Sequence, residues 1–321
     1  MVVDELNYRE APWTKWGKRV EGVMTSDEAI VSAGLDWDVS KTPIYTRNKM
    51  GQFAKIEDRY SIKNVVTDNV YGIVGKNYIP VQNREAFSFM DSLSQNKSIV
   101  YERVGSTNGG QLVWVMARLP ESFKILNDNR EEITPYMLMV NSHGGTSALK
   151  IFYTPVRIIC ANMLARAESA KIGEAFYARH TTFVNTRLAE AQKVLGLGKK
   201  FFNDYLEEAN KLAREVLPND RVQEFLNATF GQPLDRIEDD LRMPTMLAME
   251  KVKELVETGR GLDNPHIKGT KWAYLNAVSE YTDHYRVYSG KDVSSAEITG
   301  TMFGTGVGIK DKARNYLLSM N

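Results

Sequence analysis

Residues 98–120, SIVYERVGSTNGGQLVWVMARLP, contain two strand-like runs joined by a turn sequence. In SIVYERVGS and QLVWVMARL, β-branched and aromatic residues recur with the two-residue period of a strand that has one buried face. The connecting TNGG combines Asn with two glycines, which is typical of tight hairpin turns. The stretch therefore predicts an antiparallel β-hairpin, and it is the clearest element in the chain.

Strand patterns continue toward the N-terminus. Residues 44–56 predict a second hairpin that turns at NKMG, and residues 59–81 alternate β-branched and aromatic residues with turn residues. Asn83 is placed to cap a helix over residues 84–95, whose apolar side chains recur near helical spacing and would face the sheet. The pattern predicts a β-meander with one packed helix.

Strand patterns also follow the central hairpin. Residues 135–143 and 147–160 predict two more strands, joined near a Gly-Gly pair. Before the meander, residues 25–34 predict a short helix with Thr25 or Ser26 as its N-cap. Three tryptophans flank that helix and would fix the N-terminal segment to the body or to a neighbouring subunit, namely Trp13, Trp16 and Trp37.

From about Ala161 onward the periodicity becomes helical. Residues 186–216 predict one long helix or a bent pair, because Gly196 and Gly198 weaken its middle. Residues 272–288 predict an aromatic-rich helix, after which the chain would end in a glycine-rich loop and a short helix. Further short helices are predicted over residues 220–229, 235–241 and 244–258.

Strands followed by helices predict an α+β fold. We expect an antiparallel β-meander with a packed helix in the N-terminal half and a mainly helical C-terminal half. The expected regions are residues 1–160, mainly β with an N-terminal arm, and residues 161–321, mainly helical. Since no linker-like stretch divides them, we expect them to share one core.

The amino-acid composition limits the classes of protein to which the chain can belong. The chain has 321 residues, 43% hydrophobic and 25% charged, as in an ordinary globular protein. The single cysteine, Cys160, forbids an intrachain disulfide and fits a cytoplasmic location in a host cell. The N-terminus lacks the apolar region of a signal peptide, and no stretch approaches the ~20 apolar residues of a membrane span. Four scattered histidines show no metal-ligand spacing, so neither a metal nor a cofactor is expected.

Charge is unevenly distributed, although the net charge is only +1. Residues 141–200 carry nine Lys/Arg against three acids, and residues 41–63 carry six against two acids. Residues 201–260 carry eight Lys/Arg against thirteen acids. One region could therefore face a polyanion while another is acidic, and chance variation along helical surfaces is the alternative explanation.

The turn NSHGGTSA, residues 141–148, contains His143 followed by Gly144 and Gly145. The two glycines allow another chain or a ligand to approach the backbone closely. A catalytic His143 would need an acid or a nucleophile nearby, and the sequence indicates none. We therefore expect this turn to pack or to bind a backbone phosphate.

Arg157 and Cys160 lie in TPVRIICAN, which predicts a strand running into a helix. Arg157 alternates with Val156 and Ile158, so it would face solvent, an ion pair or a ligand groove. Cys160 is more typical of a small core residue than of a nucleophile.

The stretch YARHTTF places Tyr177, Arg179 and His180 close together. Basic residues among aromatic ones suit single-stranded nucleic acid, because rings stack on bases and cations hold phosphates. The alternative is a helix end that packs its aromatic residues inward.

The C-terminal stretch GTGVGIKDKAR joins glycines to basic residues at an expected helix start. Free N–H groups and the helix dipole at such a position attract an anion. The stretch lacks Walker A and dinucleotide-binding spacing, so nucleotide hydrolysis is not predicted. A tail turn or a subunit contact is the alternative. The glycines are Gly304, Gly306 and Gly308, and the basic residues are Lys310, Lys312 and Arg314.

Taken together, the chain resembles a family of unknown function whose members are encoded by phages and plasmids. The resemblance covers most of the chain, and residues 143–164 are its most specific part. It implies a mobile-element origin and an intracellular site of action, and it implies no chemistry. The order of a meander with a packed helix followed by helices is also loosely similar to a group of single-strand annealing proteins, as a likeness of fold alone. The stretches that carry the family resemblance are PWTKWG (12–17), YIPVQNREAFSF (78–89), GGQLVWVMARLP (109–120), NSHGGTSA (141–148), TPVRIICANML (154–164) and GTGVG (304–308).

These patterns favour a nucleic-acid-binding protein of a phage or plasmid, one that binds and anneals single-stranded DNA as an oligomer without nucleotide hydrolysis. The alternative is a protein-interaction or self-assembly factor, such as an inhibitor of host defence that binds a host protein, suggested by the tryptophans and the aromatic helix. The hypothesis that the protein is an enzyme using Cys160 or His143 has the least support, so no catalytic residue is predicted. The candidate nucleic-acid contacts are Lys150, Arg157, Tyr177, Arg179, His180, Lys310, Lys312 and Arg314, and the candidate turns near a ligand are His143, Gly144, Gly145, Gly304, Gly306 and Gly308.

Overall fold

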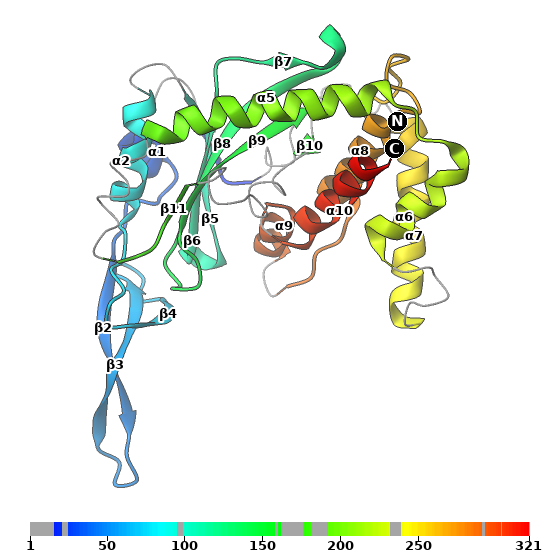
Figure 1. Ribbon diagram of the computed structural model, residues 1–321. Coiled ribbons are helices and arrows are strands. Elements are labelled where there is room, and N and C mark those ends of the chain that lie inside the picture. Colours follow the sequence, from blue (N-terminus) through cyan, green and yellow to red (C-terminus); the bar gives the residue numbers. More distant parts are fainter. Residues whose placement is uncertain are drawn as a thin grey trace, which may run out of the picture.

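The predicted central hairpin forms two strands of the main sheet in the computed structural model (Figure 1). Strands β5 (Val100–Thr107) and β6 (Leu112–Arg118) pair antiparallel, and the turn between them holds Asn108 and Gly109 at positive φ. The Asn-Gly-Gly sequence is suited to this turn because these residues adopt positive φ at low cost. The structure describes residues 16–20, 25–94, 99–157, 160–161, 176–181, 192–231, 239–290, 293–302 and 304–320.

The main sheet is antiparallel, with strand order β1-β5-β6-β8-β9-β10. Strand β11 also pairs with β9, and β7 pairs with β8. Together with the helices of the C-terminal half, this sheet makes the fold α+β, as predicted. The remaining strands are β1 (Lys18–Arg19), β7 (Phe123–Lys124), β8 (Glu132–Ser142), β9 (Leu149–Arg157), β10 (Cys160–Ala161) and β11 (Phe176–Ala178).

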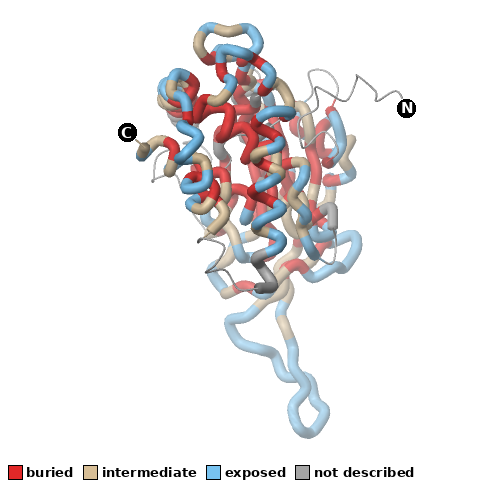
Figure 2. The backbone as a smooth tube through the Cα atoms, turned by 90° about the vertical axis from the view of Figure 1, so that its right-hand side faces the viewer, coloured by how far each residue is buried: buried red, intermediate tan, exposed pale blue. Residues whose placement is uncertain are grey.

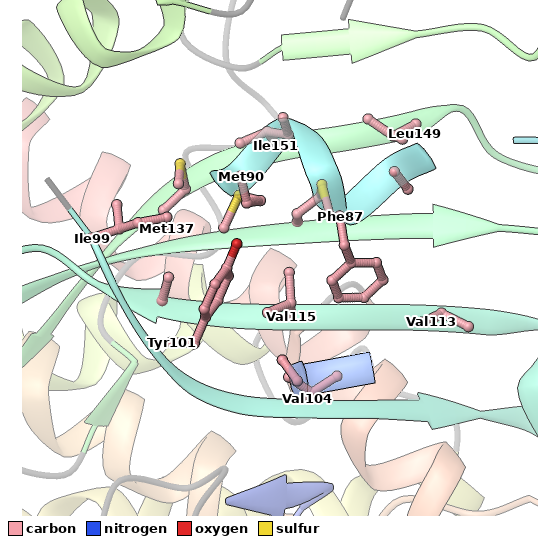
Figure 3. Packing of buried hydrophobic residues seen from close by; sticks show 14 of the residues in the cluster. Phe87, Met90, Ile99, Tyr101, Val104, Val113, Val115, Met137, Leu149 and Ile151 are labelled. Atoms are coloured by element: carbon pink, nitrogen blue, oxygen red, sulfur yellow. The ribbon is translucent and has the colours of Figure 1, made fainter. Parts of the chain in front are cut away.

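Alternation along the strands gives the sheet two apolar faces. On one face Val113 and Val115 pack beneath helices α1 (Ser26–Ser32) and α2 (Asn83–Ser94), and Figure 3 shows Phe87 of α2 over these strands. On the other face Trp114 belongs to a second cluster, which includes side chains of α9 (Val293–Met302) and α10 (Thr305–Ser319). Because both faces are covered, the inner strands are apolar almost throughout.

A second, three-stranded sheet carries an arm that projects from the body. It has the order β2-β3-β4, with β2 (Val39–Arg47), β3 (Phe53–Asn64) and β4 (Val70–Gly75). The outer parts of β2 and β3 extend beyond β4 as a two-stranded hairpin (Figure 1), and this hairpin is exposed over its length (Figure 2). We call residues 44–56 the hairpin arm; its turn at Asn48 to Gly51 agrees with the sequence pattern.

The helices of the C-terminal half surround α8 (Lys271–Glu280), of which every residue is buried. The indole Nε1 of Trp272 donates to Glu131 Oε2 at 3.1 Å, which links this helical cluster to the segment before β8. The apolar surface of this helix, which suggested a partner protein, is therefore covered by the chain itself. Its neighbours are α5 (Gln192–Arg214), α6 (Val222–Phe230), α7 (Asp239–Thr258) and α10.

Helix α5 is continuous through Gly196 and Gly198, which decides between the two predicted alternatives. A Cβ on Gly198 would lie 2.5 Å from the ring of Tyr153, so the glycine allows α5 to cross close to β9. The ring contacts of Tyr153 with Phe201 and Phe202 then join α5 to the sheet. The glycine therefore serves tertiary packing here and does not break the helix.

Several predicted elements differ from the structure. Cys160–Ala161 turns back to pair with β9, where the sequence predicts a strand running into a helix. Residues 176–178 form strand β11 within the half that is predicted to be helical. Asn83 begins α2, but its side chain donates to Leu35 O at 3.0 Å and is not an N-cap for the helix. The last two differences depend on partners distant in sequence, β9 and Leu35, whereas β10 folds back on the adjacent end of β9.

The tryptophans that flank α1 pack within the chain. Trp16 is buried in the same cluster as Trp114, and Trp37 contacts the ring of Tyr71, with 5.7 Å between the ring centroids. Trp13 lies outside the described residues. The two described tryptophans thus attach the N-terminal segment to the body, which is one of the two predicted possibilities.

Candidate functional site

A pocket of about 370 Å³ opens where three separate segments meet. The first segment follows β4, the second is the turn between β8 and β9, and the third follows β11. The sequence predicts ligand contacts separately for the turn with Gly145 and for the segment with Arg179 and His180, and the fold brings them together. The lining residues are Asn77, Tyr78, Gly145, Thr146, Ser147, Ala148, Arg179, His180 and Thr181.

His180 is the buried member of this lining, with 5% of its surface exposed. Its ring stacks on Tyr78, with centroids 4.9 Å apart and 14° between the planes. Burial lowers the pKa of the imidazole to about 4, and the backbone of Ile79 opposes that shift only in part. The ring is therefore neutral at physiological pH. Neither of its nitrogens makes a hydrogen bond of regular length and angle with a described residue, although the Ile79 backbone lies close enough to oppose the shift in pKa.

His143, in the turn between β8 and β9, is fully buried. Its Nε2 lies 2.9 Å from Oδ1 of Asn83, so Nε2 carries the proton and donates it to the amide oxygen. Burial, and secondarily the proximity of His180, lowers the pKa of His143 to about 3. His143 does not line the pocket. It holds the turn against α2 and is not placed to contact a ligand.

The two glycines of this turn have different roles. A Cβ on Gly144 would lie 2.6 Å from Nε2 of Gln111, so this residue packs inside the protein. Gly145 is exposed, adopts a φ of +73° and lines the pocket. Only Gly145 is therefore placed to present its backbone to a ligand.

Lys150 and Tyr177 lie on one face of the sheet at its β11 edge, because they are register partners in β9 and β11. Arg179 follows β11 directly and is exposed, whereas Lys150 and Tyr177 are half-buried. Two of the predicted nucleic-acid contacts thus share a face, although they come from two strands.

Arg157 is the last residue of β9 and pairs with Cys160 of β10. The residues after it, 158–159, and the side chain of Arg157 itself lie outside the described part of the structure.

The structure differs most from the sequence-based prediction at the three C-terminal cations. Lys310 is buried in an ion pair with Asp283, and both side chains are fully inaccessible. Arg314 bonds Glu208, with its Nε 3.0 Å from Oε2. Lys312 is exposed. Of these three cations, therefore, only Lys312 presents an exposed side chain, because the other two hold α10 to its neighbours.

Gly304 and Gly306, at the start of α10, are close-packed positions, whereas a Cβ on Gly308 would meet nothing within 4 Å. Gly304 is the N-cap, and Gly306 and Gly308 lie inside the helix. A Cβ on Gly306 would lie 2.4 Å from the hydroxyl of Tyr288, so its small size allows that contact. The end of the chain is a pair of helices, α9 and α10, where the sequence predicts a loop and one short helix.

The hairpin arm is a second candidate surface, which the predicted site residues do not include. Tyr45 pairs with Lys55, and Arg47 pairs with Phe53. Residues opposite each other in adjacent strands share a face, as do residues two apart in one strand. The arm therefore exposes two rings and two cations on one face, with Tyr45 56% and Phe53 73% exposed.

The base of the arm adjoins the pocket. The Nζ of Lys41, on β2, donates to Lys76 O at 2.6 Å and to Tyr78 O at 2.9 Å. Tyr78 in turn donates its hydroxyl to Ser142 O at 3.2 Å, just before the Gly-Gly turn. These bonds connect the arm's sheet to the segments that line the pocket.

The described part of the chain offers neither a metal centre nor a membrane span. No group of three or more His, Cys, Asp or Glu side chains is arranged there to hold a metal ion. No helix within the same residues is long and apolar enough to cross a membrane.

Comparison with known sequences gives one match. The model of a family described as "Domain of unknown function (DUF932)" matches residues 70–315. This range includes all three pocket segments and begins after the hairpin arm. No curated protein and no solved structure matches the chain.

Proposed function

The chain belongs to the DUF932 family, whose description names no activity, and we propose from its geometry that it binds single-stranded nucleic acid through the hairpin arm. The observation that carries this proposal is the exposed face shared by Tyr45, Lys55, Arg47 and Phe53. Exposed rings can stack on unpaired bases, and cations beside them can neutralise the phosphates. A phage or plasmid origin, implied by the resemblance, remains a prediction.

The electrostatics of the arm support this assignment. Residues 41–63 carry six Lys/Arg against Glu57 and Asp58, in a chain whose net charge is +1. The guanidinium of Arg47 lies 5.3 Å from the ring centre of Phe53, which aligns the cation with the ring. Three of these cations, Arg47, Lys49 and Lys55, lie on the arm and are exposed. Lys55 Nζ lies 3.5 Å from Glu57 Oε2, so a polyanion that binds there has to displace this carboxylate.

Single strands suit the arm better than a duplex, because stacking requires bases that are not already paired. A two-stranded ribbon can also enter the major groove of a duplex, so duplex DNA is the informative competitor. Annealing of complementary strands and assembly into an oligomer are finer predictions, and they require that more than one strand be held at once.

The test is fluorescence anisotropy of a labelled single-stranded oligonucleotide across a salt series. The Arg47→Ala/Lys55→Ala variant should bind more weakly, and its salt slope should fall by about 0.7 for each phosphate that is no longer neutralised. The matched control is Lys211→Ala/Arg214→Ala, which removes two exposed cations from α5. Equal weakening in both variants, or no binding by the wild type at low salt, would overturn the proposal. If the wild type binds duplex DNA more tightly than the single strand, the arm recognises a groove of the duplex and does not stack on unpaired bases.

A second function, self-association, is favoured by aliphatic side chains exposed around β4. Val66 is 76% exposed and Ile73 66% exposed. Exposed aliphatic surface is costly unless another surface covers it, and a second copy of the chain is the occupant we propose. Light scattering after size-exclusion chromatography tests this, since Val66→Asp/Ile73→Asp should convert an oligomer to a monomer. A wild-type monomer at all concentrations would exclude it.

A further inference from the structure

We propose that the pocket lined by Gly145, Arg179 and His180 binds a phosphate group. The site lies inside the family-matched region and does not rest on nucleic-acid binding by the arm. The phosphate could belong to a free phosphomonoester or to the phosphorylated end of a strand, and the same chemistry would recognise both.

The lining of the pocket favours an anion. Among the described residues that line the pocket, Arg179 is the only charged one, and none is Asp or Glu. Arg179 is exposed, so its guanidinium can pair with a ligand at the mouth of the pocket. A cation would find no carboxylate there, whereas an anion would find an arginine and several neutral donors.

The number of donors favours phosphate over a carboxylate. The lining residues include Thr146 and Thr181, which carry hydroxyls, and Asn77, which carries an amide, whereas the Ser147 hydroxyl donates to Ala148 O at 3.3 Å. These groups come from three segments, so they surround a ligand from several sides, which suits a tetrahedral anion with several acceptor oxygens. A planar carboxylate can be satisfied by one guanidinium fork alone. The volume of about 370 Å³ exceeds the ~30 Å³ share of one water, so an ion of several heavy atoms fits.

His180 supplies an independent reason to expect a ligand. A neutral imidazole always carries one N–H donor and one acceptor nitrogen. Both nitrogens of His180 are buried and make no hydrogen bond of regular length and angle with a described residue, and leaving such groups poorly satisfied is costly. Stacking on Tyr78 holds the ring in the lining. An oxygen of a bound phosphate would accept the proton that the imidazole has to donate.

The experiment is a titration of ¹⁵N-histidine-labelled protein with inorganic phosphate at matched ionic strength, followed by NMR of the imidazole signals. Deoxyadenosine monophosphate is the second probe, and deoxyadenosine, which lacks the phosphate, is its control. We expect both phosphates to shift the His180 signals and the nucleoside to leave them unchanged.

The Arg179→Ala variant should weaken the binding of both phosphates at least tenfold, whereas Arg179→Lys should keep part of it. Arg214→Ala, which removes an exposed arginine from α5, should bind as the wild type does. Because Arg179 is exposed, none of these variants should disturb folding. Unshifted His180 signals at a large excess of phosphate, or equal binding by Arg179→Ala, would overturn the proposal.

Oligonucleotides that differ only at the 5′ end identify the source of the phosphate. A 5′-phosphorylated strand that binds more tightly than its 5′-hydroxyl counterpart, in the wild type but not in Arg179→Ala, assigns the pocket to strand ends. Binding of the mononucleotide without that difference assigns it to free phosphomonoesters. Loss of strand binding in Arg47→Ala/Lys55→Ala with unchanged phosphate binding shows that the two sites are separate.

Discussion

The ring of His180 lies parallel to that of Tyr78, with 4.9 Å between their centroids, and this stack joins the segment after β11 to the segment after β4. The backbone N–H of Ile79 donates to His180 O at 2.9 Å, which fixes the same contact through the main chain. The wall of the pocket is therefore built by an aromatic stack and a backbone hydrogen bond between residues distant in sequence.

The two buried histidines should make stability depend on pH. Burial lowers the pKa of His143 to about 3 and that of His180 to about 4, below the ordinary value of 6.5. Between about pH 4 and pH 6.5 the unfolded chain therefore binds protons that the folded chain does not, so the free energy of unfolding falls as the pH falls. The decrease should reach at most about 1.4 kcal/mol per pH unit for each imidazole.

Urea denaturation at pH 7 and pH 5 measures this decrease. His180→Phe keeps an aromatic ring for the stack and removes one titrating group, so its pH dependence should be smaller. The pKa of Asp128, lowered to about 2 chiefly by hydrogen bonding from the Arg130 backbone, affects stability below about pH 5, under the two pH values compared. A free energy of unfolding that does not change between pH 7 and pH 5 would contradict the burial of these rings.

Removing an aromatic side chain from the arm should weaken nucleic-acid binding without affecting folding. Phe53 is 73% exposed, so Phe53→Ala should melt at the wild-type temperature. Stacking of a base on an aromatic ring contributes about 1–3 kcal/mol, which corresponds to a loss of about fivefold to a hundredfold in affinity. Anisotropy at fixed salt measures it, and Met243→Ala, an exposed apolar position on α7, is the control. If Phe53→Ala binds the oligonucleotide as tightly as the wild type does, the arm does not bind by stacking a base on Phe53.

Breaking the Lys310–Asp283 pair should be strongly destabilising. Both side chains are fully buried, so Lys310→Met leaves a buried carboxylate without its cation and should cost about 3–5 kcal/mol of stability. Lys310→Met/Asp283→Asn should recover much of that stability, because no buried charge remains. Denaturation midpoints compare the two variants. An unaffected single variant would show that Lys310 is at the surface, as the sequence pattern predicts.

A methyl group at Gly72 should displace the turn that leads into the pocket. The Cβ would lie 2.2 Å from Gly144 O, and backbone at that distance must move. Gly72→Ala should therefore cost about 1–3 kcal/mol, as overpacking does. Gly308→Ala is the matched control, because a Cβ there meets nothing within 4 Å and the position is helical, so the change should stabilise by up to about 1 kcal/mol. Thermal melting measures both changes: the melting temperature should fall below the wild-type value in Gly72→Ala and rise above it in Gly308→Ala.

Some of the site could be predicted from the sequence. The aromatic and basic residues around Arg179 and the glycines after His143 stand out as short motifs, and the pocket contains members of both. Their proximity could not be predicted, because it depends on the pairing of β11 with β9. The hairpin arm has a signal in the charge count of residues 41–63, but its role as a projection depends on how far β2 and β3 extend beyond β4.

The sequence by itself determined the local elements of this protein: the two hairpins, the short capped helix, and the change from strands to helices. Alternation and turn residues act over a few positions, so they can be read without a partner. Only the tertiary structure decided that Lys310 is buried while Lys312 is exposed, that Gly306 packs against Tyr288, and that His180 lines a pocket. Burial and pairing are properties of contacts between distant segments, and a charge or a glycine has the same local pattern whether it faces water or the core.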